Sequence, residues 1–223
     1  MRRARLGGVA LAAVAAVLTA CTGIPTSGQV IPHEEIDIED DSIPDVGGVP
    51  QAPMPGDRPE GIVSGFLEAM KFYEVNYETA RKFLTPTAAA EWQPEVATTI
   101  YDSEPMIEVV AEDRVVVTAP VAATLEGARE YTHVPAGTEL EFNIELEEVA
   151  GQWRIATPPQ GLVIRDADFD GEFRAYNLFY FDPSFSALVP DPVYLPTRAR
   201  LSTLLAQELL EGPSPWLAPA VAT

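Results

Sequence analysis

The stretch from Thr138 to Val149 constrains the fold more than any other, because its apolar and polar residues alternate from 139 to 147. The apolar set is Leu140, Phe142, Ile144 and Leu146, and the polar set is Glu139, Glu141, Asn143, Glu145 and Glu147. Successive side chains of a strand point to opposite faces, so this pattern predicts an antiparallel strand with one buried and one wet face. Ala150-Gly151 then predicts a tight turn, and residues 152–156 are expected to form the returning strand of a hairpin.

Helices are expected before this strand. The run Asp57-Arg58-Pro59-Glu60 resembles a capping box and predicts a helix that Asp57 caps. Apolar side chains then recur on one helical face: Ile62, Val63, Phe66, Leu67 and Met70. A second helix is expected from about Tyr77, and Thr85-Pro86 predicts the cap and first residue of a short third helix that runs to Trp92.

The order of these elements predicts an α+β fold. Residues 106–110 and 114–123 are rich in β-formers, so 57–160 should form N-terminal helices packed on a curved antiparallel sheet. The order is similar to the cone fold of nuclear transport factor 2 (NTF2-like), an analogy of fold that carries no activity. Residues 161–173 are expected to be a linker.

Residues 174–223 predict a second, smaller α+β unit. A strand is expected at 176–181 and further strand segments at 188–190 and 193–196. A helix ended by Gly212-Pro213 follows, with an apolar side of Leu201, Leu204, Leu205, Leu209 and Leu210. One helix and two or three strands are too few to close a core, so we expect this unit to be the incomplete start of a domain.

The N-terminus predicts a lipid anchor. Arg2, Arg3 and Arg5 precede an uncharged apolar stretch, 6–18, that is too short to cross a bilayer, so 1–20 should be a signal peptide. Leu18, Thr19, Ala20 and Cys21 fit the lipobox of bacterial lipoproteins, and Cys21 is the single cysteine of 223 residues. We expect its sulfur to be linked to diacylglycerol. Two acyl chains anchor a protein stably, which places it on the outer, extracytoplasmic face of the plasma membrane.

Charge limits the partners. Residues 1–20 hold three of the 14 basic residues and none of the 34 acidic ones, so the mature formal charge is −23. This charge argues against binding nucleic acid or anionic headgroups and favours a partner with a basic face. Residues 22–56 hold six prolines, five glycines and no Lys or Arg, which predicts a disordered tether after Cys21.

Several segments, in this order, resemble the LpqB family, lipoproteins of high-GC Gram-positive bacteria. They are Pro59–Val63, Phe66–Met70, Tyr77–Pro86, Gln152–Ile155, Tyr180–Pro183, Leu188–Pro192, Leu209–Ser214 and Trp216–Val221. The resemblance covers nearly the whole chain beyond the tether, and the lipobox agrees with it. The last segments also resemble the start of a GerMN module, after which family members continue through the rest of that module and a β-propeller-like region.

The resemblance implies a non-catalytic accessory lipoprotein without a cofactor. Its partner would be the extracytoplasmic part of the sensor histidine kinase MtrB. Its role would be to regulate MtrA–MtrB signalling in cell-envelope homeostasis. The alternative is a lipoprotein that binds a ligand or the cell wall through the cone pocket or the GerMN module.

One acidic motif is a weak calcium candidate. Asp166, Asp168 and Asp170, followed by Gly171, match the first half of an EF-hand loop. Asn177 stands where the loop needs a bidentate Glu. The competing interpretation is an acidic linker in which Phe169 packs, so we expect no metal site.

The remaining candidates each have a structural and a functional interpretation. Asp102, Tyr101 and Tyr131 are conceivable proton-transfer residues of a cone fold, although structural roles are the simpler explanation. The three tryptophans, Trp92, Trp153 and Trp216, are expected in packing rather than in a sugar-stacking surface. The acidic side of 139–147 is either a solvated sheet face or a docking face for a basic partner. No nucleophile elbow, phosphate loop or His-rich metal motif occurs in the sequence.

Overall fold

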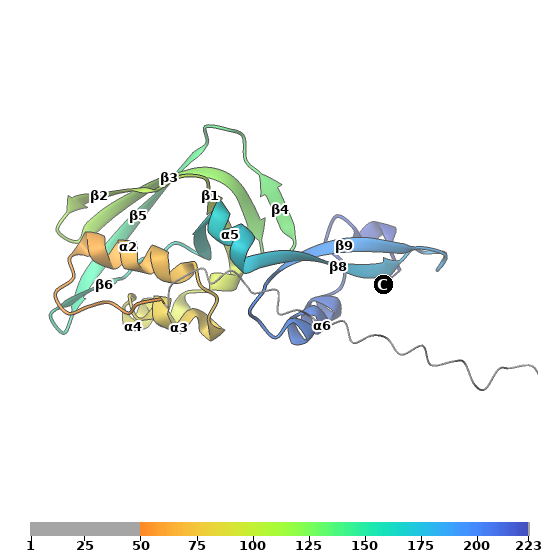
Figure 1. Cartoon of the computed structure of the whole chain (residues 1–223), viewed down its shortest axis with the longest axis horizontal. Coiled ribbons are helices and arrows are strands. Elements are labelled where there is room, and N and C mark those ends of the chain that lie inside the picture. Colours follow the sequence, from red (N-terminus) through yellow and green to blue (C-terminus); the bar gives the residue numbers. More distant parts are fainter. Residues whose placement is uncertain (1–49, 223) are drawn as a thin grey trace, which may run out of the picture. The chain divides into compact units, whose positions relative to one another are not determined.

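The computed structural model describes residues 50–222, so the predicted signal peptide, the lipobox with Cys21 and the tether up to residue 49 lie outside the described residues. The elements follow the predicted order, helices first and then a sheet (Figure 1). The helical elements are α2 (Pro59–Met70), η1 (Val75–Tyr77), α3 (Glu78–Arg81), α4 (Pro86–Glu91), η2 (Pro94–Val96), α5 (Asp166–Glu172), α6 (Leu201–Glu211) and η3 (Ala218–Ala220), where η is a 3₁₀ helix. The strands are β1 (Ala97–Tyr101), β2 (Met106–Ala111), β3 (Arg114–Glu126), β4 (Glu130–His133), β5 (Glu139–Val149), β6 (Gln152–Ile155), β7 (Leu162–Arg165), β8 (Phe173–Phe181) and β9 (Leu188–Pro196). The α+β prediction is confirmed.

Strand β3 organises the main sheet, which has seven strands with the path β6-β5-β3-β1-β7. The first half of β3 lies between β2 and β5, and its second half lies between β1 and β4. Its buried and less buried residues alternate along thirteen positions. One long strand with different neighbours along its two halves accounts for the pronounced curl of the sheet in Figure 1.

The sheet is mixed, which corrects the prediction of a purely antiparallel one. Strand β7 pairs in parallel with β1, and Thr98 lies opposite Leu162. Leu162, Val163 and Ile164 are all buried, and helices α2 and α5 both contact β7. The segment 161–173, expected as a linker, therefore forms β7 and α5 instead.

Helix α2 fills the concave side of the sheet, as Figure 1 shows. Its predicted apolar face is buried, and Phe66 lies 5.3 Å from the ring of Trp92. The Trp92 Nε1 atom donates hydrogen bonds to the carbonyl oxygens of Pro159 (3.0 Å) and Gly161 (3.2 Å). Each fully buried side chain of this size stabilises the fold by about 1.5–3 kcal/mol.

Of the helix caps predicted at Asp57 and Thr85, the one at Thr85 is correct. The Oγ1 of Thr85 accepts a hydrogen bond from the backbone nitrogen of Ala88 (3.2 Å), so Thr85 caps α4. Asp57 does not cap α2. Pro59 is the first helical residue and Arg58 the N-cap, so the Asp57 carboxylate instead accepts from the backbone nitrogen of Met54 (2.7 Å).

The hairpin β5–β6 and the C-terminal segment also follow the sequence pattern. Ala150 and Gly151 both have positive φ, as a two-residue hairpin turn requires. Strands β8 and β9 form a separate two-stranded sheet, on which α6 packs through Leu201, Leu204 and Leu205. The prediction of one continuous apolar side is wrong for the end of α6, because Leu209 is half exposed and Leu210 is 87% exposed.

Candidate functional site

The conceivable proton-transfer residues are not gathered into a site. Tyr101 lies at the end of β1, where burial, and next the carboxylate of Asp168, raises the pKa of its phenol to about 12. Asp102 is exposed, and Tyr131 pairs with Leu125 across the β3–β4 ladder. Within residues 50–222 no hydrogen bond or ring contact joins these three side chains.

The three aspartates of the calcium candidate lie on helix α5 rather than in a loop. Asp168 accepts a hydrogen bond from Arg165 Nη2 (3.1 Å), and its Oδ2 lies 3.8 Å from Lys71 Nζ. Asp170 is exposed. Among the residues described, no group of three or more His, Cys, Asp or Glu is gathered as metal ligands. Phe169 is buried and stacks on Phe173 with 4.9 Å between ring centroids.

The tryptophans and the acidic strand occupy different environments. Trp92 is buried in the core, Trp153 is partly buried against it, and Trp216 is 62% exposed. The glutamates of β5 are exposed along one face of the sheet. Two arginines lie beside them: Arg114 Nη2 is 3.5 Å from Glu145, and Arg154 lies opposite Glu147. The β5 face therefore stays mainly acidic.

The space enclosed by the curved sheet is filled with side chains. Phe66, Met70, Trp92, Ile100 and Ile144 are all fully buried there. A ligand inside the cone would have to displace this core, so the candidate sites lie at its rim.

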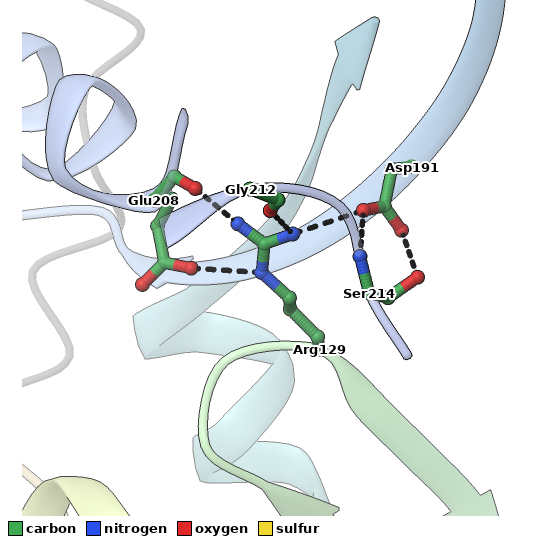
Figure 2. A network of polar contacts seen from close by, with 5 residues as sticks. All are labelled: Arg129, Asp191, Glu208, Gly212 and Ser214. Atoms are coloured by element: carbon green, nitrogen blue, oxygen red, sulfur yellow. Dashed lines mark hydrogen bonds and ion pairs between the residues drawn. The ribbon is translucent and has the colours of Figure 1, made fainter. Parts of the chain in front are cut away.

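A partly buried arginine joins the main sheet to the C-terminal segment (Figure 2). Arg129, in the turn between β3 and β4, lies between Asp191 of β9 and Glu208 of α6. Its Nη1 is 2.9 Å from Asp191 Oδ2 and 2.6 Å from the Gly212 carbonyl, and its Nε is 3.0 Å from Glu208 Oε2. A further hydrogen bond runs from Nη2 to the Glu208 carbonyl. One guanidinium thus satisfies two carboxylates and two carbonyls at the end of α6.

Asp191 is completely buried, so its charge needs the partners that surround it. Besides Arg129, it accepts hydrogen bonds from the backbone nitrogen and the Oγ of Ser214, both at 2.8 Å. Nearby, the backbone nitrogen of Tyr194 donates to the Ala128 carbonyl (2.7 Å), and the rings of Tyr194 and Tyr131 stack at 5.2 Å. These contacts fix α6 and β9 against the β3–β4 turn.

This junction borders a groove of about 290 Å³. Four aromatic residues line it: Tyr73, Tyr77, Phe173 and Tyr194. Three glutamates add negative charge: Glu95 from η2, and Glu208 and Glu211 from α6. The groove is therefore aromatic in its walls and acidic along its rim, which is a surface chemistry suited to a cation.

Tyr77 is the most constrained of these residues. It is 4% exposed, and burial, followed by the nearby Tyr73, Glu95 and Glu172, raises the pKa of its phenol above the ordinary range. Tyr77 and its neighbour Asn76 both adopt left-handed backbone conformations, with φ of 49° and 59°. Two successive non-glycine residues in this region store strain, which is concentrated at functional positions in many proteins.

No pattern in the sequence predicted the Arg129 network or the groove. One signal was available: Asp191 is a single charge in the otherwise apolar strand sequence Val-Pro-Asp-Pro-Val, and a buried carboxylate requires a cation or several donors. The sequence could not identify Arg129 as that cation, because it lies 62 positions earlier.

Comparison with known proteins places the chain in a family. Residues 52–170 match the family model "Lipoprotein LpqB, N-terminal domain". The chain is 35% identical to "Lipoprotein LpqB" of Nocardia farcinica, 33% identical to that of Thermobifida fusca and 32% identical to that of Streptomyces avermitilis. These alignments cover 96%, 96% and 98% of this chain and 36%, 36% and 38% of the relatives, so the chain spans little more than a third of their length. No solved structure matches it. With the family model covering more than half of its residues, the chain belongs to the LpqB lipoprotein family.

Proposed function

We propose that this protein is an extracytoplasmic lipoprotein, anchored to the membrane through Cys21, that acts without catalysis as an accessory of a sensor histidine kinase of the MtrB type. The kinase role is what the resemblance to the LpqB family implies, and two features support the membrane anchor. The sequence has a lipobox ending in its single cysteine, and its relatives are named lipoproteins. No helix within residues 50–222 is long and apolar enough to cross a membrane.

The anchor is tested by changing the acylated residue. In cells fed a labelled fatty acid, the wild-type protein should carry the label and sediment with membranes, whereas Cys21→Ser should carry none and be released. Equal labelling of both proteins would contradict the assignment of Cys21.

The acidic β5 face is the surface we assign to the kinase. Its glutamates are exposed, and within residues 50–222 the basic residues beside them are Arg114 and Arg154, so the face can attract a basic surface. Charged faces of this kind increase the association rate and make binding sensitive to salt. A partner that uses the face should therefore dissociate more readily as the salt concentration rises.

Crosslinking in intact cells, followed by mass spectrometry, tests the partner. The extracytoplasmic part of a sensor kinase should be recovered with the wild-type protein and lost with the double variant Glu141→Lys/Glu145→Lys. The matched control is Glu78→Lys/Glu91→Lys, which makes the same change in charge at exposed positions of α3 and α4. If both double variants fail to crosslink the kinase, binding depends on the net charge of the protein and not on the β5 face.

Recovery of cell-wall synthesis proteins, without a kinase, would overturn the kinase proposal. It would favour the alternative of a lipoprotein that binds the cell wall or a ligand. Recovery of the kinase with all variants would retain the partnership and exclude the β5 face.

A further inference from the structure

We infer that the groove bordered by Tyr73, Tyr77, Tyr194, Glu95 and Glu211 is a receptor for one cationic side chain, Lys or Arg, presented by a protein partner. The inference rests on the proposed function only in taking the partner to be a protein. It concerns a surface separate from the acidic β5 face.

The size of the groove fits a single long side chain. Its volume of about 290 Å³ lies at the lower limit of pockets that hold small organic ligands, about 300–1,000 Å³. Its floor is apolar and includes Leu125 and Leu162, which are buried residues of the main sheet. The methylene stem of Lys or Arg can lie on such a floor while its charged head stays at the polar rim.

The charge at the rim favours a cation. Glu208 is already bonded to Arg129, which leaves its charge largely balanced. Glu95 and Glu211 are exposed and form no ion pair with any residue in 50–222. Of the nearby cations, Arg198 lies 3.4 Å from the buried carboxylate of Glu172 and Arg200 is exposed in a neighbouring depression. Two carboxylates are thus available to an incoming cation.

The aromatic walls supply a second, independent feature. The rings of Tyr73 and Tyr77 meet edge to face at 5.9 Å, and the ring of Tyr194 lines the groove from β9. A cation within about 6 Å of such ring faces is attracted by their quadrupoles. Arginine adds stacking of its planar group on an aromatic ring, so it should bind at least as well as lysine.

The hydroxyl of Tyr77 points to the same kind of ligand. Its side chain is more than nine-tenths buried and lines the groove, yet its hydroxyl forms no hydrogen bond within the described part of the chain. The oxygen can accept a hydrogen bond from a guanidinium or ammonium group. The groove therefore offers an acceptor at its base and two carboxylates at its rim.

The groove also has a fixed shape. Arg129 holds the end of α6, which carries Glu208 and Glu211, against the β3–β4 turn. A preformed site loses little conformational entropy when it binds.

The test uses the whole chain and small probes. Nα-acetyl-arginine methylamide and Nα-acetyl-lysine methylamide are titrated and followed by amide chemical shifts, with Nα-acetyl-norleucine methylamide as the uncharged control. Millimolar binding that shifts amides around Tyr73, Tyr77 and Tyr194 is expected for the cations and not for norleucine. Shifts that are equal for norleucine, or that are spread along β5, would overturn the inference.

Variants locate the site. Glu95→Gln/Glu211→Gln should weaken arginine binding by roughly fivefold, because each change removes an attraction of about 0.5 kcal/mol between exposed charges. Glu78→Gln/Glu91→Gln, at exposed positions outside the groove, should leave it unchanged. Equal weakening by both pairs would show that the groove is not a specific site. Because the probes involve no kinase, failure here leaves the crosslinking result intact, and failure of crosslinking leaves the groove intact.

Discussion

Replacing Arg129 by methionine should uncouple the C-terminal segment from the main sheet. Methionine keeps the long apolar stem but removes the guanidinium that contacts Asp191 and Glu208. Asp191 is completely buried, so its carboxylate would be left without a cation beside it.

The structure sets the size of the effect. Removing one partner of a buried ion pair costs about 3–5 kcal/mol, because the remaining charge is uncompensated. The carbonyls of Glu208 and Gly212 also lose their donor, and each such loss can add about 1–3 kcal/mol where no water replaces it. Ser214 still donates two hydrogen bonds to Asp191, which offsets part of the loss. We therefore expect the free energy of unfolding to fall by about 3–5 kcal/mol.

Urea denaturation of the wild type and of Arg129→Met measures this loss. The matched control is Arg114→Met, since Arg114 pairs with Glu145 at 3.5 Å but is half exposed, and such pairs contribute about 0–1 kcal/mol. In addition, Asp191→Asn should lower the free energy of unfolding less in the Arg129→Met variant than in the wild type, because the two residues interact. The reasoning is refuted if Arg129→Met and Arg114→Met cost the same, or if Asp191→Asn costs the same in both backgrounds.

Three further predictions concern single residues. Gly161→Ala should lower the free energy of unfolding by about 2–4 kcal/mol in urea denaturation, because φ is +75° and a Cβ would lie 2.1 Å from the Ala97 carbonyl oxygen. The control Gly127→Ala, at φ +57° with open space around it, should lower it by about 1 kcal/mol. Trp92→Phe should cost about 1–3 kcal/mol in the same assay, since two buried carbonyls lose a donor; an unchanged midpoint would contradict this. The raised pKa of Tyr101 means that the unfolded chain ionises first, so stability should hold below pH 10 and fall between about pH 10 and 12. Tyr101→Phe should make this loss of stability with rising pH less steep. If the variant has the same pH profile as the wild type, Tyr101 is not its cause.

Local patterns predicted the elements whose cause is local. The apolar face of α2 and the alternation along β5 follow from helical and strand periods. The α2 face is buried as expected, and along β5 the apolar residues are less exposed than the glutamates between them. Thr85 caps α4 because Ser and Thr favour this position before a proline. The sequence also supplied the family, through the order of several short segments rather than any one motif.

The errors have non-local causes. Strand β7 has four residues and no alternation, and its partner β1 lies far back in the sequence, so nothing near 162–165 indicates a parallel pair. The Arg129 network and the groove likewise depend on residues from both halves of the chain. A site assembled by tertiary packing leaves only indirect signs in the sequence, such as the lone charge of Asp191 within an apolar strand.

The pairing of β7 with β1 also bears on how the protein folds. Until residue 165 is available, β1 has β3 on one edge and an unpaired row of backbone groups on the other. The two acceptors of Trp92 lie in the same late stretch, 67 and 69 positions away. Folds that depend on such distant contacts fold slowly, and an uncovered strand edge can pair with another chain in the meantime. A chain is synthesised from its N-terminus, so it should be most prone to self-association after β1 has been made and before β7 has been made. That period ends when the four residues of β7 pair with β1 and cover its free edge.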